Sequence, residues 1–214
     1  MRTYPHSIPR WVPAVWSQRL WHVPTERREV FLTFDDGPVP GATEFVLDAL
    51  ARARARATFF CVGENVAKHP ELFRRLLSEG HGVGNHTQYH LNGRRTPLHA
   101  YLADVARCDA TMQQVGGAHV RLFRPPYGRL TAAQSRALRQ LDYRVVMWSV
   151  LAGDFDAQLP AERCLRRTWH RVAPGAVVTL HDSTKALPTV QYVLPRLLDR
   201  LAAGSYTCAV LPGA

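Results

Sequence analysis

Short apolar runs alternate with longer amphipathic segments along most of this 214-residue chain. The runs are rich in β-branched and aromatic residues, which predicts seven strands. They cover residues 30–34, 58–62, 82–85, 120–124, 144–149, 176–180 and 206–211. The segments between them carry apolar residues at spacings of three and four, a pattern typical of helices with one buried face. Because strands that alternate with helices are usually parallel, the chain is predicted to form an α/β fold, and a closed or nearly closed barrel in particular.

Several helix starts are marked in the sequence. Pro97, Pro160 and Pro188 stand where helices are expected to begin, a position in which the missing N–H of proline does no harm. Thr131 followed by Gln134 is a capping-box pattern, which predicts a further helix start.

The first 28 residues differ in composition from the rest of the chain. Trp11, Trp16 and Trp21 stand there among arginines and prolines. We expect residues 1–28 to be an N-terminal extension that packs on the outside of the barrel, and residues 29–214 to be a single domain. Tryptophan with arginine also suits the headgroup layer of a membrane, so a weak membrane-surface contact through the three tryptophans is the alternative.

The chain is strongly basic, with a formal net charge of +10. An anionic partner would suit that charge. All but two of the 27 basic residues are arginine, however, and no basic segment is interleaved with aromatic residues as single-stranded nucleic acids require. We therefore do not expect a nucleic-acid partner, and the sequence leaves the oligomeric state open.

The expected compartment is the cytoplasm, because the sequence contains no recognisable signal peptide or membrane span. The cysteines agree with a reducing environment. Cys61, Cys108, Cys164 and Cys208 lie in apolar or amphipathic segments without C-x-x-C spacing, which predicts free buried thiols.

Polar residues that can bind a metal follow two of the predicted strands. Asp35 and Asp36 come directly after residues 30–34, and two adjacent carboxylates do not both ionise cheaply without a cation or another charge nearby. His86 and His90 follow the third predicted strand and would share one face if that segment were helical. Two imidazoles and one carboxylate are the three protein ligands of an open metal site.

Further polar groups follow later strands. They are the segment 124–128 after the fourth strand, Asp154 after the fifth, and His181 with Asp182 after the sixth. Since barrel enzymes carry their active sites at the carboxyl ends of the strands, we expect all these groups to meet at one rim.

Four motifs in this order resemble those of the polysaccharide deacetylases, carbohydrate esterase family 4, also called the NodB-homology domain. They are Thr33–Pro38, His86–His90, Arg124–Gly128 and Leu180–Asp182. The resemblance covers about residues 29–211. It implies a distorted barrel of seven or eight strands and a metal-dependent hydrolase that removes N-acetyl groups from N-acetylglucosamine-containing poly- or oligosaccharides, such as chitin oligomers or peptidoglycan. The implied cofactor is a divalent metal, usually Zn²⁺, with Co²⁺, Ni²⁺ or Mn²⁺ as alternatives.

The resemblance also implies roles for single residues. Asp36, His86 and His90 would hold the metal, while Asp35 would stay off it and act as the general base. Arg124 would pair with Asp35 and keep it ionised.

Three more residues complete the implied catalytic set. The backbone N–H of Tyr127 would stabilise the oxyanion, and His181 would protonate the departing amine. Asp154 would orient His181 and support its charge.

The fourth motif of the family is altered in this chain. Counted from Trp148, Leu151 replaces the first aspartate of the motif and Phe155 replaces its tryptophan. The residues expected to contact substrate are Leu180, Phe155, Pro126 and Trp148. The altered motif leaves the acetyl pocket and the sugar specificity open.

Other functions share parts of this pattern. A deacetylase could act on a small cytoplasmic amide, or on an O-acetyl ester such as acetylated xylan. A carbohydrate-binding module on an inactive barrel would not need a base and an acid. An Fe(II) oxygenase also uses two histidines and one carboxylate, but it would not need Asp35, Arg124 and His181 to handle protons.

Overall fold

The computed structural model describes residues 16–214, and Trp11 lies outside them. The strands are β1 (Glu29–Asp35), β2 (Thr58–Cys61), β3 (Gly82–Asn85), β4 (Leu122–Phe123), β5 (Arg144–Val145), β6 (Val150–Leu151), β7 (Val177–His181) and β8 (Thr207–Cys208). The α-helices are α2 (Ala42–Arg52), α3 (Gly63–Lys68), α4 (Pro70–Ser78), α5 (Leu98–Gly116), α6 (Ala132–Gln140), α7 (Ala161–Trp169) and α8 (Leu187–Ala203), and two short 3₁₀ helices are η1 (Gly93–Arg95) and η2 (Pro126–Gly128).

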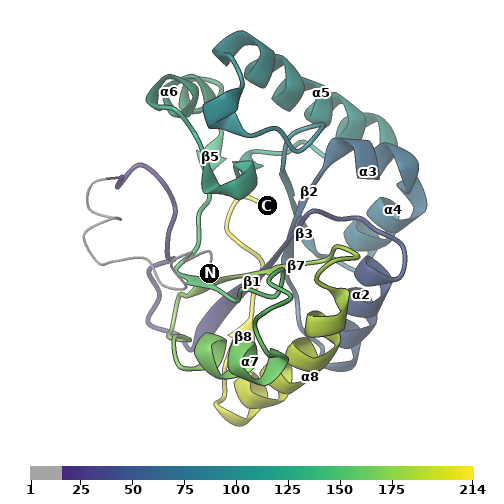
Figure 1. Ribbon diagram of the computed structural model, residues 1–214, viewed down its shortest axis with the longest axis vertical. Helices are drawn as coiled ribbons and strands as arrows, with labels where there is room; N and C mark the ends of the chain where they lie inside the picture. Colours follow the sequence, from purple (N-terminus) through teal and green to yellow (C-terminus); the bar gives the residue numbers. More distant parts are fainter. Residues whose placement is uncertain (1–15) are drawn as a thin grey trace.

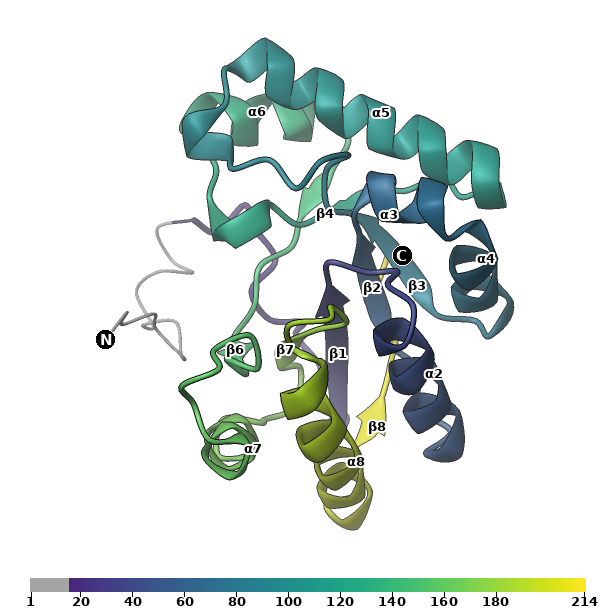
Figure 2. The same ribbon diagram turned by 45° about the vertical axis from the view of Figure 1, so that its right-hand side comes forward.

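The strands form one curled parallel sheet in the order β5-β4-β3-β2-β1-β7-β6, and β8 pairs with the start of β1. This arrangement confirms the predicted distorted α/β barrel, and Figures 1 and 2 show the helices packed around the outside of the strands. The predicted strand at residues 144–149 is wrong in one respect. The chain pairs with β4 only as far as Val145 and then crosses to the other edge of the sheet, where β6 pairs with β7.

The gap that this crossing leaves in the barrel wall is filled from the N-terminal side of the chain. Leu20 pairs with Val146, and His22 pairs with Ala176 just before β7. The amide of Leu20 donates to the carbonyl of Val145 at 2.9 Å. Residues 20–23 therefore connect the two edges of the sheet and form part of the wall, while the domain boundary at residue 28 stays a prediction.

This position also affects the predicted membrane contact. Trp21 is buried beside Phe123 and Val145, so its ring is not available to a membrane surface. Within the described residues the predicted contact rests on Trp16, which is 38% exposed. No helix in residues 16–214 combines the length and the apolar character needed to cross a membrane.

The two faces of each strand have different surroundings because successive side chains point to opposite sides of a sheet. Val30, Leu32 and Phe34 of β1 belong to the large core between the sheet and the helices. Phe31 faces the other way, into a smaller apolar cluster with residues of β2, β4 and β7. Continuing that alternation, Asp35 lies on the inner face at the carboxyl end of β1.

The helix starts follow the sequence signals. Pro97 and Pro160 precede the first residues of α5 and α7, and Pro188 lies in the first turn of α8. Thr131 and Gln134 form the predicted capping box of α6. All four cysteines are free; Cys208 is half-buried and the other three are buried.

Candidate active site

A groove of about 1280 Å³ opens at the carboxyl ends of the strands. Its lining combines carboxylates, imidazoles and aromatic rings, most of them from the loops that follow β1, β3, β4 and β7. They include Asp35, Asp36, His86, His90, Tyr127, Trp148, Leu151, Phe155, His181 and Lys185. The structure thus brings the polar groups from separate strand ends to one rim, as the sequence predicts.

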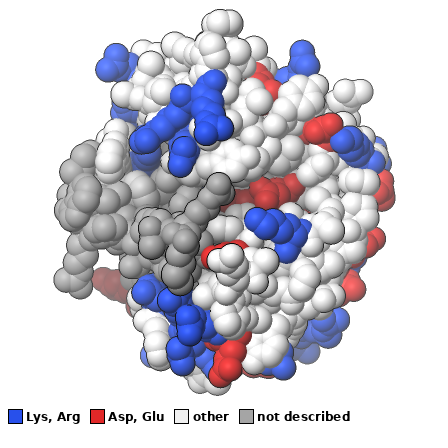
Figure 3. Space-filling view, in the orientation of Figure 1, with Lys and Arg blue, Asp and Glu red and all other residues white. Residues whose placement is uncertain are grey.

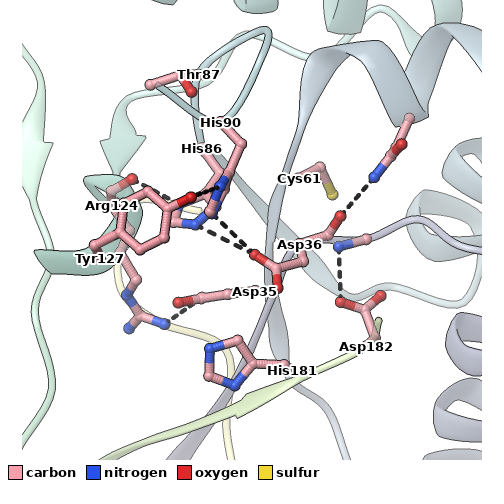
Figure 4. Close-up of polar contacts among 12 residues, drawn as sticks. Asp35, Asp36, Cys61, His86, Thr87, His90, Arg124, Tyr127, His181 and Asp182 are labelled. Atoms are coloured by element: carbon pink, nitrogen blue, oxygen red, sulfur yellow. Dashed lines mark hydrogen bonds and ion pairs between the residues drawn. The ribbon is translucent and has the colours of Figure 1, made fainter. Parts of the chain in front are cut away.

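Three of these residues form a candidate metal centre. The ligand atoms of Asp36, His86 and His90 all lie within 4.8 Å of one another. Oδ1 of Asp36 is 3.2 Å from Nε2 of His90 and 3.8 Å from Nε2 of His86. In Figure 4 both imidazole rings point toward this carboxylate.

The donor set fits a divalent cation. Oδ1 of Asp36 is buried and makes no hydrogen bond within residues 16–214, although a buried carboxylate oxygen normally has a partner. Burial raises the pKa of Asp36, but His90, His181 and His86 outweigh it and hold that pKa well below its usual value. Burial lowers the pKa of His86 to about 4, which favours the neutral form that binds metals.

Both imidazoles are oriented by a contact at the other ring nitrogen. Nδ1 of His86 lies 2.7 Å from the carbonyl oxygen of Arg124, and Nδ1 of His90 lies 3.2 Å from the hydroxyl of Tyr127. A contact of this kind fixes the ring and directs Nε2 toward the ion.

The loop that carries these histidines is not helical, so the condition under which a spacing of four would place them on one face is not met. Thr87 and His90 have positive φ angles of 67° and 53°, which bend the chain sharply. Oδ2 of Asp104, on α5, accepts hydrogen bonds from the amides of Gln88 and Tyr89 at 2.8 and 3.3 Å. These hydrogen bonds help to hold the loop in the conformation in which the two histidines converge.

Sequence reasoning missed Asp104. It is a buried carboxylate on the otherwise largely apolar face of α5, near the buried Tyr101, Val105 and Cys108. An acidic residue within a predicted apolar stripe is the signal that could have indicated it.

Asp35 is held separately from the metal centre. Its Oδ1 accepts a hydrogen bond from Nη1 of Arg124 at 2.7 Å, and both side chains are almost fully buried. Arg124 also donates to the hydroxyl of Thr33 at 2.7 Å and to the carbonyl of Met147 at 3.0 Å. Burial lowers the pKa of the guanidinium, but arginine stays charged at any ordinary pH. The carboxylate of Asp35 is therefore anchored beside the candidate metal ligands rather than among them.

His181 and Asp154 form a second anchored pair. Oδ1 of Asp154 is 2.9 Å from Nδ1 of His181, and its Oδ2 accepts from the amide of His181 at 2.7 Å. Burial alone would lower the pKa of His181, but the carboxylates of Asp154, Asp36 and Asp35 raise it to about 9. These carboxylates favour the cationic form of the imidazole, and Figure 4 shows its ring near Asp35 on the side away from His86 and His90.

Asp182 shapes the turn that carries Asp36, a role that sequence reasoning did not assign. Its Oδ1 accepts from the amide of Gly37 at 2.9 Å, and its Oδ2 contacts the hydroxyl of Thr43 at 2.6 Å. Asp36 adopts a φ of 84°, in the left-handed region, so the turn needs such support. Burial raises the pKa of Asp182 to about 8. A Cβ at Gly37 would come within 1.9 Å of Asp182, which explains the glycine.

The residues expected to contact substrate divide into two groups. Trp148 and Phe155 line the groove, and the ring of Phe155 packs edge-on against His181 at 5.0 Å. Leu180 is fully buried in the core between sheet and helices and does not line the groove, because its neighbour His181 takes the inner face of β7. Pro126 is buried as well, and Pro125 takes its place in the groove lining.

Fold and site together define an α/β-barrel protein with a candidate metal centre beside a separately anchored carboxylate. The sequence profile described as polysaccharide deacetylase matches residues 22–146. The chain therefore belongs to the polysaccharide deacetylases, which are hydrolases, and the resemblance in the motifs is confirmed.

Individual relatives agree with this membership. A peptidoglycan-N-acetylglucosamine deacetylase of Bacillus cereus is 31% identical over 81% of this chain, which spans 64% of that protein. A chitooligosaccharide deacetylase of a Bradyrhizobium species is 38% identical to this chain. The alignment covers 72% of this chain and 71% of that deacetylase. The crystal structure of a peptidoglycan N-acetylglucosamine deacetylase in complex with 4-naphthalen-1-yl-N-oxidanyl-benzamide superimposes with a TM-score of 0.88, at 28% identity and 94% coverage of both chains.

Proposed function

We propose that this protein is a divalent-metal-dependent deacetylase that removes N-acetyl groups from N-acetylglucosamine-containing poly- or oligosaccharides of the chitin-oligomer or peptidoglycan type. The observation that carries the proposal is the division of labour between two adjacent carboxylates. Asp36 lies with His86 and His90, whereas Asp35 is bound to Arg124 and left beside them. Neighbouring acids with different surroundings are suited to different chemical roles.

Asp36, His86 and His90 would hold the cation. Zn²⁺ is the best candidate, because it accepts nitrogen and oxygen ligands and keeps a position open when only three come from the protein. Bound there, it would polarise the acetyl carbonyl and lower the pKa of a coordinated water.

The residues around the cation would move the protons. Asp35 is placed to take a proton from the attacking water, and Arg124 fixes the direction in which its carboxylate points. The backbone N–H of Tyr127 would donate to the oxygen on which negative charge develops. His181, cationic at neutral pH, would deliver a proton to the leaving amine from Nε2, since Nδ1 faces Asp154.

The anchored pairs also separate this proposal from its alternatives. An Fe(II) oxygenase would use the three metal ligands but would have no need for the Asp35–Arg124 and His181–Asp154 pairs. A carbohydrate-binding module on an inactive barrel would need neither pair. Action on a small amide or on an O-acetyl ester remains the second candidate, because the same base, acid and cation would serve an ester.

Acetate release from chitohexaose, from peptidoglycan fragments and from acetylated xylan tests the proposal. Incubation with a chelator should abolish release, and added Zn²⁺ should restore it under anaerobic conditions. Asp35→Asn should keep one equivalent of metal, measured by elemental analysis, and lose at least a hundredfold in kcat, the low end of what a general base contributes. Asp48→Asn, an exposed substitution on α2, is the control and should change neither quantity.

Two results would contradict the proposal. A fully active Asp35→Asn variant would rule out the assigned base. Loss of metal together with activity in that variant would instead place Asp35 among the ligands.

A further inference from the structure

A second cleft, of about 700 Å³, lies beside the active-site groove. The two hollows share three lining residues, Trp21, Gly128 and Met147. Adjacent residues of η1 face different hollows, since Arg94 lines the cleft and Arg95 lines the groove. The two hollows therefore adjoin, and a ligand longer than the groove would reach the edge of the cleft.

The cleft is lined by basic residues without acidic ones. Four arginines contribute to its wall: Arg19, Arg94, Arg136 and Arg139. None of them forms an ion pair within residues 16–214, and residues 1–15 contain no aspartate or glutamate that could supply one. The positive charge of the cleft is thus not neutralised by any carboxylate side chain of the protein.

Two buried polar atoms in the same cleft also lack partners. Oγ of Ser135, a residue that is only 3% exposed, makes no hydrogen bond within the described chain, and neither does Nε of Arg19. Buried polar atoms in folded proteins are nearly always satisfied, so a bound water or a ligand group is expected to satisfy these two atoms. Burial and the nearby charge of Arg94 lower the pKa of Arg19, so an anion placed there would relieve a repulsion between the two guanidinium groups.

Figure 3 shows basic side chains gathered next to the central hollow in which acidic side chains are visible. Acidic and basic surfaces thus lie side by side on this face. The carboxylates line the groove where the cation would bind, and the arginines line the adjoining cleft.

We propose that the cleft lined by Arg19, Arg94, Arg136 and Arg139 is a substrate subsite that binds a carboxylate group on the glycan, so that the enzyme prefers an acidic N-acetylglucosamine polymer to a neutral one. This inference rests on the proposed function. Every second sugar of a peptidoglycan strand carries a lactyl group, whose carboxylate is free where the stem peptide has been removed and is amide-linked to that peptide elsewhere, whereas chitin oligomers carry no carboxylate. Arginine suits the task because its planar guanidinium donates two parallel hydrogen bonds to a carboxylate.

The test uses a matched pair of substrates. One is a tetrasaccharide of alternating N-acetylglucosamine and N-acetylmuramic acid with free lactyl carboxylates, and the other is the same tetrasaccharide with those groups converted to amides. We expect kcat/KM to be at least tenfold higher for the acid form, since a hydrogen bond to a charged group contributes enough for about that factor. The preference should fall as salt rises from about 50 to about 500 mM, because salt screens the attraction between the substrate carboxylate and the arginines of an open cleft.

The double variant Arg136→Gln with Arg139→Gln removes two charges from exposed positions on α6. The acid-to-amide ratio of kcat/KM should drop about tenfold in this variant. Arg52→Gln with Arg200→Gln is the matched control, because both residues are exposed and line neither hollow. Its ratio should equal that of the unchanged protein.

Direct binding keeps this proposal separate from the proposed function. Calorimetric titration with the acid tetrasaccharide should show binding that weakens about tenfold in the double variant, whether or not acetate is released. Binding that depends on these arginines without acetate release would defeat the deacetylase proposal and leave the subsite standing. Equal rates on the two tetrasaccharides, or a ratio unaffected by the double variant, would overturn the subsite.

Discussion

Replacing Arg124 by methionine should destabilise the protein strongly, because the guanidinium is the central contact of the inner polar layer. Arg124 is completely buried and Asp35 is only 4% exposed. The substitution leaves the carboxylate of Asp35 buried without its charged partner, which costs about 3–5 kcal/mol in comparable sites. The hydroxyl of Thr33 also loses the hydrogen bond that it accepts from Arg124. This loss costs less, because the hydroxyl still donates to the carbonyl of Val178 at 2.9 Å. We therefore expect the free energy of unfolding to fall by about 3–5 kcal/mol.

A double-mutant cycle isolates the ion pair from the rest of the substitution. Asp35→Asn in the same background removes the unpaired charge, so the double variant should be at least about 2 kcal/mol more stable than the sum of the two single changes predicts. The measurement is urea unfolding followed by circular dichroism in the presence of a chelator, with similar m-values required for all variants. Arg144→Met, at an exposed position on β5, is the control and should change stability by less than about 0.5 kcal/mol.

The reasoning would be refuted by either of two outcomes. A loss below about 1 kcal/mol for Arg124→Met would mean that the carboxylate of Asp35 is hydrated or neutral once the arginine is gone. Strict additivity in the cycle would mean that the two side chains contribute independently, despite the 2.7 Å between them.

Two further predictions follow from the same site. Asp154→Asn should lower the pKa of His181 from about 9 toward its ordinary value, so the alkaline limb of kcat/KM and the NMR titration of that imidazole should both move down by a pH unit or more. A raised histidine pKa stabilises the fold below about pH 6.5, and this gain is lost as pH rises through about 9. The free energy of unfolding of the variant should therefore vary less over that range. An unchanged titration of His181 would contradict its pairing with Asp154. Gly37→Ala should destabilise the protein by about 1–3 kcal/mol, since the new Cβ would lie 1.9 Å from Oδ2 of Asp182. Thermal unfolding measures this loss, and an unaltered melting temperature would show that the turn can move aside.

The sequence allowed the barrel and its functional rim to be predicted because both depend on local patterns. The alternating runs placed a strand before each polar motif. Because the strands are parallel, their carboxyl ends all lie at the same edge of the sheet. The positions of Asp35 and His181 at this rim were predicted in this way. Their shared surroundings follow from pairing, since these two residues are opposite each other in the register of β1 and β7.

The errors arise where tertiary contacts outweigh local pattern. A spacing of four would place His86 and His90 on one face only in a helix, but the amides of Gln88 and Tyr89 donate to the distant Asp104 and the loop takes a different shape. Leu180 was expected to contact substrate, whereas the structure buries it in the core because it alternates with His181 along β7. The short β6 was missed because its partner is the strand that follows it by some 25 residues, and nothing within residues 144–151 signals the crossing.

Residues 20–23 close the barrel, although they precede every recognised motif. The groove at the carboxyl ends of the strands therefore depends on them. Those few residues satisfy backbone groups on both open margins of the sheet, and Trp21 forms part of the groove wall with Met147. A shortened version that starts at β1 would retain each proposed metal ligand and proton carrier. It would nevertheless expose two unpaired strand margins, which invite association between molecules, and it would remove Trp21 from the wall of the groove.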